Sequence, residues 1–127
     1  MNNQKARNVE FSENRMKQIG KTIISVETGF IKIGLIDSRS IVKLLEVTSQ
    51  VTLAKALKGA PDYICTKIFT NMSSRESIML KEDMEWMGPV LKKDVLEAQK
   101  EIVQILEQFE SSNQIVIPKI MDNDIVE

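Results

Sequence analysis

The stretch that decides the fold is SSRESIMLKEDMEWMGP, residues 73–89. It has the ends of one short helix. Ser73 followed by Glu76 fits a capping box, in which hydroxyl and carboxylate each satisfy a free amide of the first turn. Gly88 can adopt the left-handed conformation just past the last turn, and Pro89 cannot continue a helix. The sequence therefore predicts a helix with defined ends.

The two faces of this expected helix differ in character. Leu80, Met84 and Met87 recur at the spacing of one helical face, which predicts a stripe that packs on the core. The other side mixes both charge signs with a large aromatic ring; its residues are Arg75, Met79, Glu82, Asp83 and Trp86. A mixed-charge face is most often the ordinary solvated side of an amphipathic helix. A tryptophan among charges is instead typical of a docking surface, and periodicity leaves both interpretations open.

Capping and breaking residues predict three short helices before this stretch. Asp37 or Ser38 caps the first of them. Residues 48–49 interrupt the chain and cap the second, which ends at Gly59. Pro61 stands in the first turn of the third, whose broad apolar arc indicates a central position.

The flanking parts of the chain are less regular. After a mainly polar N-terminal stretch, a helix is expected from Ser12, with Phe11 and Met16 placed to form a hydrophobic staple around its cap. Met16, Ile19 and Ile23 continue the apolar face of this helix. Residues 30–33 either continue this helix or form a strand. Asp94 is expected to cap the longest helix, and residues 115–118 are expected to be extended.

Composition limits the class of protein. A chain of 127 residues that is 43% hydrophobic and 28% charged is expected to form one globular domain. The 5 glycines and 3 prolines are few, which favours helices over a turn-rich β architecture. The single cysteine, Cys65, cannot form an intramolecular disulfide and is expected to be a small buried hydrophobe. Without histidine, a zinc site and a histidine-based triad are excluded.

Charge and hydropathy exclude other functions. The net charge of −1 gives no electrostatic case for nucleic-acid binding, even though Lys92 and Lys93 form a basic pair. No apolar run approaches the ~20 residues that a membrane-spanning helix needs, and the N-terminus lacks the apolar core of a secretion signal. The expected location is the cytoplasm.

No arrangement of residues indicates catalysis. The nearest glycine–lysine pair, residues 20–21, lacks the upstream glycine and the strand of a phosphate-binding loop. Glu82 and Asp83 are adjacent, but neighbours on a helix diverge by ~100° and do not converge on one site. We expect no enzymatic activity, no cofactor and no metal.

Several blocks carry a family resemblance. They are residues 37–41 (DSRSI), 56–60 (ALKGA), 67–73 (KIFTNMS), 80–83 (LKED), 87–90 (MGPV), 93–99 (KDVLEAQ) and 115–117 (IVI). In this order they resemble the C-terminal domain of the flagellar motor switch protein FliG. The resemblance implies an all-α fold, a compact six-helix armadillo-like domain with an extra N-terminal helix. It divides the chain into a divergent, partly helical leader, residues 1–36, and the FliG-like domain, residues 37–127.

The resemblance also implies a function and a site. The family domain is a rotor component that presents charged residues to the cytoplasmic loop of the stator A subunit, for motility and torque generation. We name the matching residues the charged ridge: Lys58, Arg75, Glu82, Asp83 and Lys92. Lys92 is included because Leu91 stands where the family has an arginine. Other switch-complex or rotor-ring proteins are further expected partners, and the cytoplasmic face of the inner membrane, at the flagellar basal body, is the expected location.

A second departure leaves an alternative open. The aromatic Met-Phe-x-Phe hinge that precedes the domain in the family corresponds here to residues 27–30, where only Phe30 is retained. The alternative function is that of a stand-alone helical adaptor or regulator that pairs with another protein through the leader.

Overall fold

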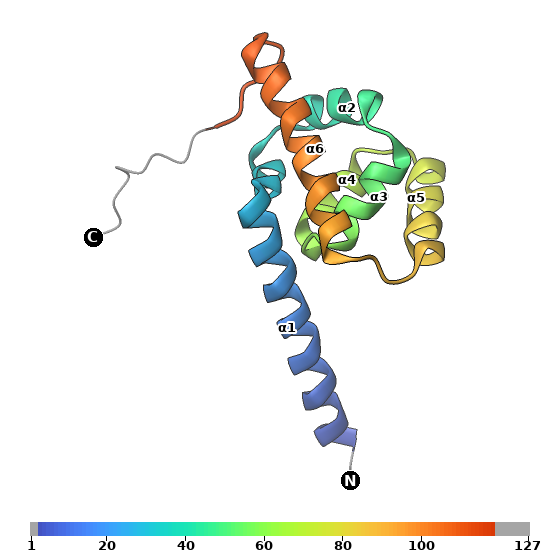
Figure 1. Ribbon diagram of the computed structural model, residues 1–127. Helices are drawn as coiled ribbons and strands as arrows, with labels where there is room; N and C mark the ends of the chain where they lie inside the picture. Colours follow the sequence, from blue (N-terminus) through green and yellow to red (C-terminus); the bar gives the residue numbers. More distant parts are fainter. Residues whose placement is uncertain (1–2, 119–127) are drawn as a thin grey trace, which may run out of the picture.

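The computed structural model describes residues 3–118, which form helices joined by short connections. Figure 1 shows a bundle from which the N-terminal helix projects. The elements are α1 (Asn3–Thr28), the 3-10 helix η1 (Phe30–Leu35), α2 (Ser38–Val47), α3 (Gln50–Lys58), α4 (Asp62–Thr70), α5 (Ser74–Met87) and α6 (Lys92–Ser111). Within residues 3–118 there is no strand, and the expected all-α class is confirmed.

Local capping chemistry sets several helix boundaries where the sequence places them. Asp37 accepts a hydrogen bond from the Ser40 amide, which lowers the pKa of its carboxyl, and Ser49 caps α3 in the same way. At α5 the Glu76 amide donates to the Ser73 hydroxyl (3.1 Å). The Ser73 hydroxyl in turn donates to the Glu76 carboxylate (3.0 Å). The carboxylate therefore binds the capping hydroxyl and not the Ser73 backbone amide, so one of the two hydrogen bonds of a capping box is formed.

Other boundaries differ from the sequence-based expectations. α1 begins at Asn3, so Ser12 lies inside the helix, and α1, with 26 residues, is longer than α6, with 20. The N-cap of α6 is Leu91, and Asp94 lies in the first turn, where its charge is favourable near the free amides. Pro61 is the N-cap of α4 and lies just outside the helix. Gly88 has the expected positive φ of 63°, but its ψ of −157° is extended.

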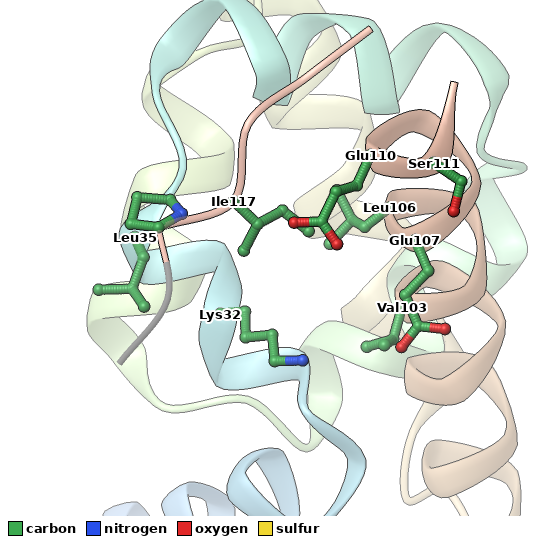
Figure 2. Close-up of a pocket in the computed structure, with 9 residues that line it drawn as sticks. Lys32, Leu35, Val103, Leu106, Glu107, Glu110, Ser111 and Ile117 are labelled. Carbon is green, nitrogen blue, oxygen red and sulfur yellow. The ribbon is translucent and has the colours of Figure 1, made fainter. Parts of the chain in front are cut away.

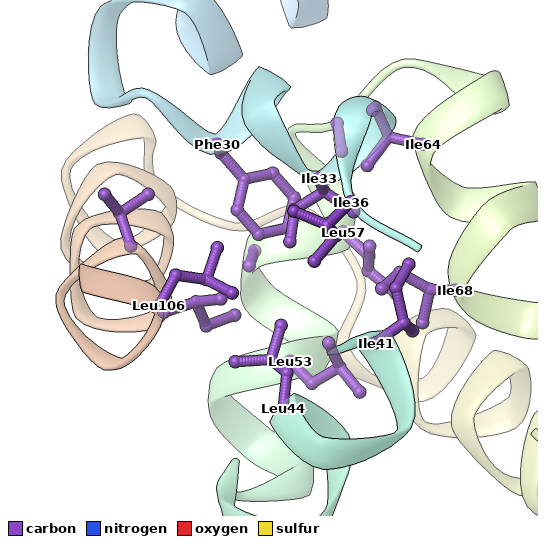
Figure 3. Close-up of a cluster of buried hydrophobic side chains, with 14 of the residues drawn as sticks. Phe30, Ile33, Ile36, Ile41, Leu44, Leu53, Leu57, Ile64, Ile68 and Leu106 are labelled. Carbon is purple, nitrogen blue, oxygen red and sulfur yellow. The ribbon is translucent and has the colours of Figure 1, made fainter. Parts of the chain in front are cut away.

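The segment whose conformation the sequence left undecided is a 3-10 helix that enters the core. Gly29 adopts φ 83° and ψ 0°, a left-handed conformation that ends α1 and redirects the chain. Phe30, Ile33 and Ile36 are then fully buried, because a three-residue spacing keeps them on one side of η1. Figure 3 shows them packed against side chains of α2, α3, α4 and α6. Residues 30–36 of the expected leader are thus part of the same core as the helices that follow.

Helix α3 lies at the centre of the bundle and packs against both α6 and α5. Close approach to α6 depends on Gly59, the C-cap of α3. A Cβ built on Gly59 would lie 2.2 Å from the Cγ1 of Val95, a buried residue of α6. Only glycine fits at this contact without displacement of a neighbour.

A buried polar cluster joins the end of α1 to the bundle. The Thr28 hydroxyl donates to the Gln99 side-chain carbonyl (2.7 Å), and the Gln99 amide donates to the Ala56 carbonyl (2.9 Å). The Ser25 hydroxyl donates to the Gly59 carbonyl (3.3 Å). Gln99 is completely buried, and each buried polar side-chain atom in the described part of the chain has a hydrogen-bond partner. The cluster therefore fixes α1 to α3 and α6.

Cys65 lies half-buried on α4, with its Sγ 3.4 Å from the Leu57 carbonyl oxygen. Burial raises the pKa of this thiol from 9.0 to about 11. About a hundredfold less thiolate is then present at pH 8 than for a free thiol, since the pKa differs by about two units.

We expect Cys65 of the folded protein to react with Ellman's reagent about a hundredfold more slowly than the same residue in denaturant. The folded rate should rise about tenfold per pH unit as far as pH 10, because the thiolate is the reacting form. Equal rates in the folded and denatured protein would contradict the prediction.

Candidate functional site

Helix α5 presents a mixed-charge stripe on the side opposite its attachment to the core. Leu80 is fully buried, and Met84 and Met87 pack half-buried beside it. Arg75, Glu82 and Trp86 follow the spacing i, i+7, i+11, so they lie on one line of the opposite face. All three are exposed, and the Trp86 side chain is 89% exposed. The face that the sequence singled out is therefore open to solvent.

Arg75 and Glu82 have no hydrogen bond or ion pair with any residue in the described part of the chain. A helix rises ~1.5 Å per residue, so seven residues separate the two charges by about 10 Å along α5. A partner could therefore contact each charge separately. Met79 and Ile78 lie close to this line and are about half exposed, so the surface around the charges is partly apolar.

Asp83 lies at the edge of the stripe and is bound to a neighbouring helix. The Gln50 side-chain amide at the start of α3 donates a 2.5 Å hydrogen bond to its carboxylate. The contact is exposed and leaves the negative charge in place, because the amide is neutral. It fixes the Asp83 side chain between α3 and α5.

The two lysines of the charged ridge lie apart from this line. Lys58 is half-buried at the end of α3, and Lys92 is exposed at the first turn of α6. Lys58 borders a surface cavity of about 390 Å³; its other lining residues are Lys21, Leu57, Asp62, Cys65, Phe69, Lys81, Met84 and Glu85. In this cavity Lys81 of α5 stacks on the Phe69 ring, with Nζ 4.8 Å from the centroid. The structure thus groups Arg75, Glu82 and Asp83 on α5, with Lys58 and Lys92 on adjoining elements.

A groove between η1, α6 and the C-terminal segment is a second candidate site. Figure 2 shows its lining residues, and its volume is about 540 Å³. Lys32 contributes one positive charge, and Glu107 and Glu110 contribute two negative charges. None of the charged-ridge residues lines it, and none of its described lining residues is a nucleophile hydrogen-bonded to a base.

No group of three or more His, Cys, Asp or Glu side chains within residues 3–118 could hold a metal ion. None of the helices described is long and apolar enough to cross a membrane.

Sequence reasoning missed Gln50, and it missed Ser25 and Thr28, which bind α1 to the bundle through hydrogen bonds. Gln50 and Asp83 are 33 residues apart, and no local pattern links a helix-start glutamine to a later carboxylate. Gln99 did carry a signal, because it lies between Val95 and Ile102 on the apolar face of α6. A polar side chain in that position predicts a buried hydrogen-bond partner.

Comparisons with known proteins agree with this fold. The family described as "FliG C-terminal domain" matches residues 10–117. The chain is 43% identical to the flagellar motor switch protein FliG of Borreliella burgdorferi over 97 residues, which are 76% of this chain and 28% of that protein. It is 46% identical to FliG of Thermotoga maritima over 84 residues, which are 66% of this chain and 25% of that protein. The chain thus spans about a quarter of the length of these relatives.

Solved structures show the same likeness. A crystal structure of a FliG fragment from Helicobacter pylori superposes with a TM-score of 0.69 and 31% identity, over 70% of this chain and 39% of that chain. Full-length FliG from Aquifex aeolicus superposes with a TM-score of 0.64 and 38% identity, over 65% of this chain and 26% of that chain.

Proposed function

The chain belongs to the FliG C-terminal domain family, and from this membership we propose that it is a non-enzymatic component of a bacterial flagellar rotor that serves motility and torque generation. Its proposed partner is the cytoplasmic loop of the stator A subunit, with other switch-complex or rotor-ring proteins as further candidates. The proposed location is the cytoplasmic face of the inner membrane, at the flagellar basal body. The contact surface is the charged ridge.

The observation that carries this proposal is the exposed face of α5. Arg75 and Glu82 point into solvent, and neither has a hydrogen bond or ion pair with any of residues 3–118, so a second protein could bind them without breaking contacts of the described fold. Exposed charge pairs each contribute about 0.2–1 kcal/mol. Such contacts form and break easily, as a surface that passes successive partners requires.

The proposal predicts a salt-sensitive complex with a stator-loop peptide. Exchanging the two charges of the ridge (Arg75→Glu with Glu82→Lys) keeps the net charge and turns attraction into repulsion at both positions. We expect the affinity to fall at least about tenfold, which corresponds to about 1.4 kcal/mol. The affinity of the unaltered protein should fall as the salt concentration rises, because salt screens exposed charges. Isothermal titration calorimetry at several salt concentrations measures both effects.

A matched control lies on α2. Arg39 and Glu46 are also exposed, seven residues apart and in the same order of charge. Arg39→Glu with Glu46→Lys should leave the affinity unchanged. A peptide with its own two charges exchanged should regain affinity for the ridge variant. Equal affinity and equal salt dependence for the ridge variant and the unaltered protein would refute the proposal.

A further inference from the structure

Trp86 ends a row of side chains along the exposed face of α5. Four residues form this row, in the order Arg75, Met79, Glu82 and Trp86. They are four, three and four residues apart, so they lie on one line about 16 Å long in which charged and apolar side chains alternate. At 89% exposed, Trp86 is the most exposed of the large hydrophobic side chains in residues 3–118. Tryptophan is also among the residue types that most often supply the binding energy of a protein interface.

The indole ring of Trp86 takes no part in the described fold. It has no hydrogen bond and no ring contact with any of residues 3–118. Leu80, Met84 and Met87 attach α5 to the core from the other side of the helix. Removal of the indole should therefore leave the packing of α5 intact, and the ring is free to contact another molecule.

Two carboxylates beside Trp86 define what can bind there. Glu82 and Asp83 lie four and three residues before it, so both are its neighbours on the helix surface. Side chains of a helix lean toward its N-terminus, which brings the indole toward this pair. The Gln50 amide that binds Asp83 is neutral and leaves the negative charge in place. An open aromatic ring between two carboxylates is complementary to a positively charged group.

No nearby positive charge of the fold occupies this position. Neither Glu82 nor Asp83 forms an ion pair with a lysine or arginine in the described part of the chain. Lys81, the one basic residue in the second half of α5, lies over the Phe69 ring instead. The last turn of α5 has no basic residue, and the carbonyl end of the helix adds partial negative charge. This end of α5 therefore attracts a cation and repels an anion.

We propose that Trp86 anchors the contact with the partner protein and that, together with Glu82, it binds one arginine side chain of that partner. This inference rests on the proposed function, because the stator loop is the expected source of the arginine. A guanidinium is planar and charged, so it can pair with a carboxylate and stack on an aromatic ring at the same time. Arg75, at the other end of the row, would meet an acidic residue. The row thus also sets the direction in which the partner lies.

The same charges disfavour a membrane surface as the occupant. Tryptophan is also found at lipid interfaces, but surfaces that bind anionic lipids surround it with lysine and arginine. Here Glu82 and Asp83 are the charged neighbours of Trp86, and an anionic lipid surface would be repelled.

Fluorescence of the full chain tests the contact directly, because Trp86 is its only tryptophan. A stator-loop peptide that lacks tryptophan should shift the emission to shorter wavelength and reduce quenching by acrylamide, since the ring leaves water. The matched control moves the tryptophan: Trp86→Phe with Met16→Trp places it on the projecting helix α1 (Figure 1), at a position that is 72% exposed. The emission of this variant should not change when the peptide is added.

Affinities measured by calorimetry test the role of the ring. Trp86→Ala should weaken the peptide about two- to thirtyfold, and Trp86→Phe, which keeps a ring, should recover part of the loss. Among variants of the peptide in which each arginine is changed to glutamine, one should lose less affinity for Trp86→Ala than for the unaltered protein. Ile23→Ala, at a position of α1 that is 61% exposed, should bind like the unaltered protein. Circular dichroism should show equal helix content for these proteins, because the altered side chains are exposed.

A titration with simple peptides separates this proposal from the proposed function. Capped tetra-arginine should shift the emission of Trp86, capped tetra-glutamate should not, and Glu82→Gln with Asp83→Asn should abolish the shift. If tetra-arginine acts in this way but the loop peptide does not bind, the proposed function fails and the arginine site stands.

Other outcomes would overturn the arginine site itself. One is a loop peptide that binds with full affinity to Trp86→Ala and leaves the emission of Trp86 unchanged. Another is an emission that changes with neither peptide. Binding of Trp86 to phosphatidylserine vesicles, or self-association that Trp86→Ala abolishes, would assign the ring to a different occupant.

Discussion

Gly59→Ala is expected to destabilise the protein by about 1–3 kcal/mol, the usual cost of adding a methyl group to a filled interior. The new Cβ would lie 2.2 Å from Val95 Cγ1, and a β-branched side chain has little rotamer freedom with which to move away. The backbone of Gly59 (φ −108°, ψ 14°) is open to alanine, so the cost comes from the contact with α6. Thermal unfolding should show a midpoint lower by roughly 3–15 °C.

Two variants separate this clash from other effects of alanine. Gly20→Ala places the same methyl group in open space inside α1 and should be neutral or stabilising. Val95→Ala removes the obstructing methyl groups, so the double variant with Gly59→Ala should be more stable than the sum of the single effects predicts. Additive losses would show that the contact between Gly59 and Val95 does not limit packing of α3 on α6.

Gln99→Leu is expected to cost about 1–3 kcal/mol although the side-chain volume is nearly kept. The change removes two buried hydrogen bonds, one from the Thr28 hydroxyl and one to the Ala56 carbonyl. Each of these groups keeps a second, longer bond: the Thr28 hydroxyl donates to the Ser25 carbonyl (3.3 Å), and the Ala56 carbonyl accepts from the Gly59 amide (3.3 Å). An intramolecular hydrogen bond contributes about 0.5–1.5 kcal/mol, so two lost bonds give this range. Urea unfolding followed by circular dichroism measures the loss.

The second substitution in a double-mutant cycle identifies the cause. Thr28→Val removes the other partner of the same bond, and it also removes the acceptor of the Phe30 amide (3.2 Å). The bond between Thr28 and Gln99 can be lost only once, so the double variant should be more stable than the sum of the two single losses predicts. Gln104→Leu, at an exposed position of the same helix, should change stability by no more than about 0.5 kcal/mol. An equal loss for Gln99→Leu and Gln104→Leu would assign the effect to helix propensity.

Features that depend on a few neighbouring residues were predictable from the sequence. Asp37, Ser49 and Ser73 cap their helices as expected, because an N-cap bond reaches only two or three residues along the chain. The start of α1 was not predictable, because residues 3–11 carry neither an N-cap signal nor an apolar period. Residues 30–33 were undecided for a different reason: a short apolar run fits a strand, an α-helix or a 3-10 turn equally well.

In the candidate site, too, the features set by helical periodicity were predictable, and those set by tertiary packing were not. The face of α5 that holds Arg75, Glu82 and Trp86 follows from helical periodicity, and the structure leaves these three residues exposed. The family resemblance selected the residues of the charged ridge. The resemblance itself agrees with the family match over residues 10–117. The bond between Gln50 and Asp83 depends on tertiary packing, which no pattern in a single sequence encodes.

The central position of α3 has a mechanical consequence. A lateral force applied to α5 passes first to α3 and from there to both α6 and α1, because α3 packs against α6 and its C-cap Gly59 accepts a hydrogen bond from Ser25 of α1. The bond between Thr28 and Gln99 joins α1 to α6 as well. Leu80 is the one fully buried side chain of α5, so we expect α5 to shift on α3 under load before α1, α3 and α6 move relative to one another.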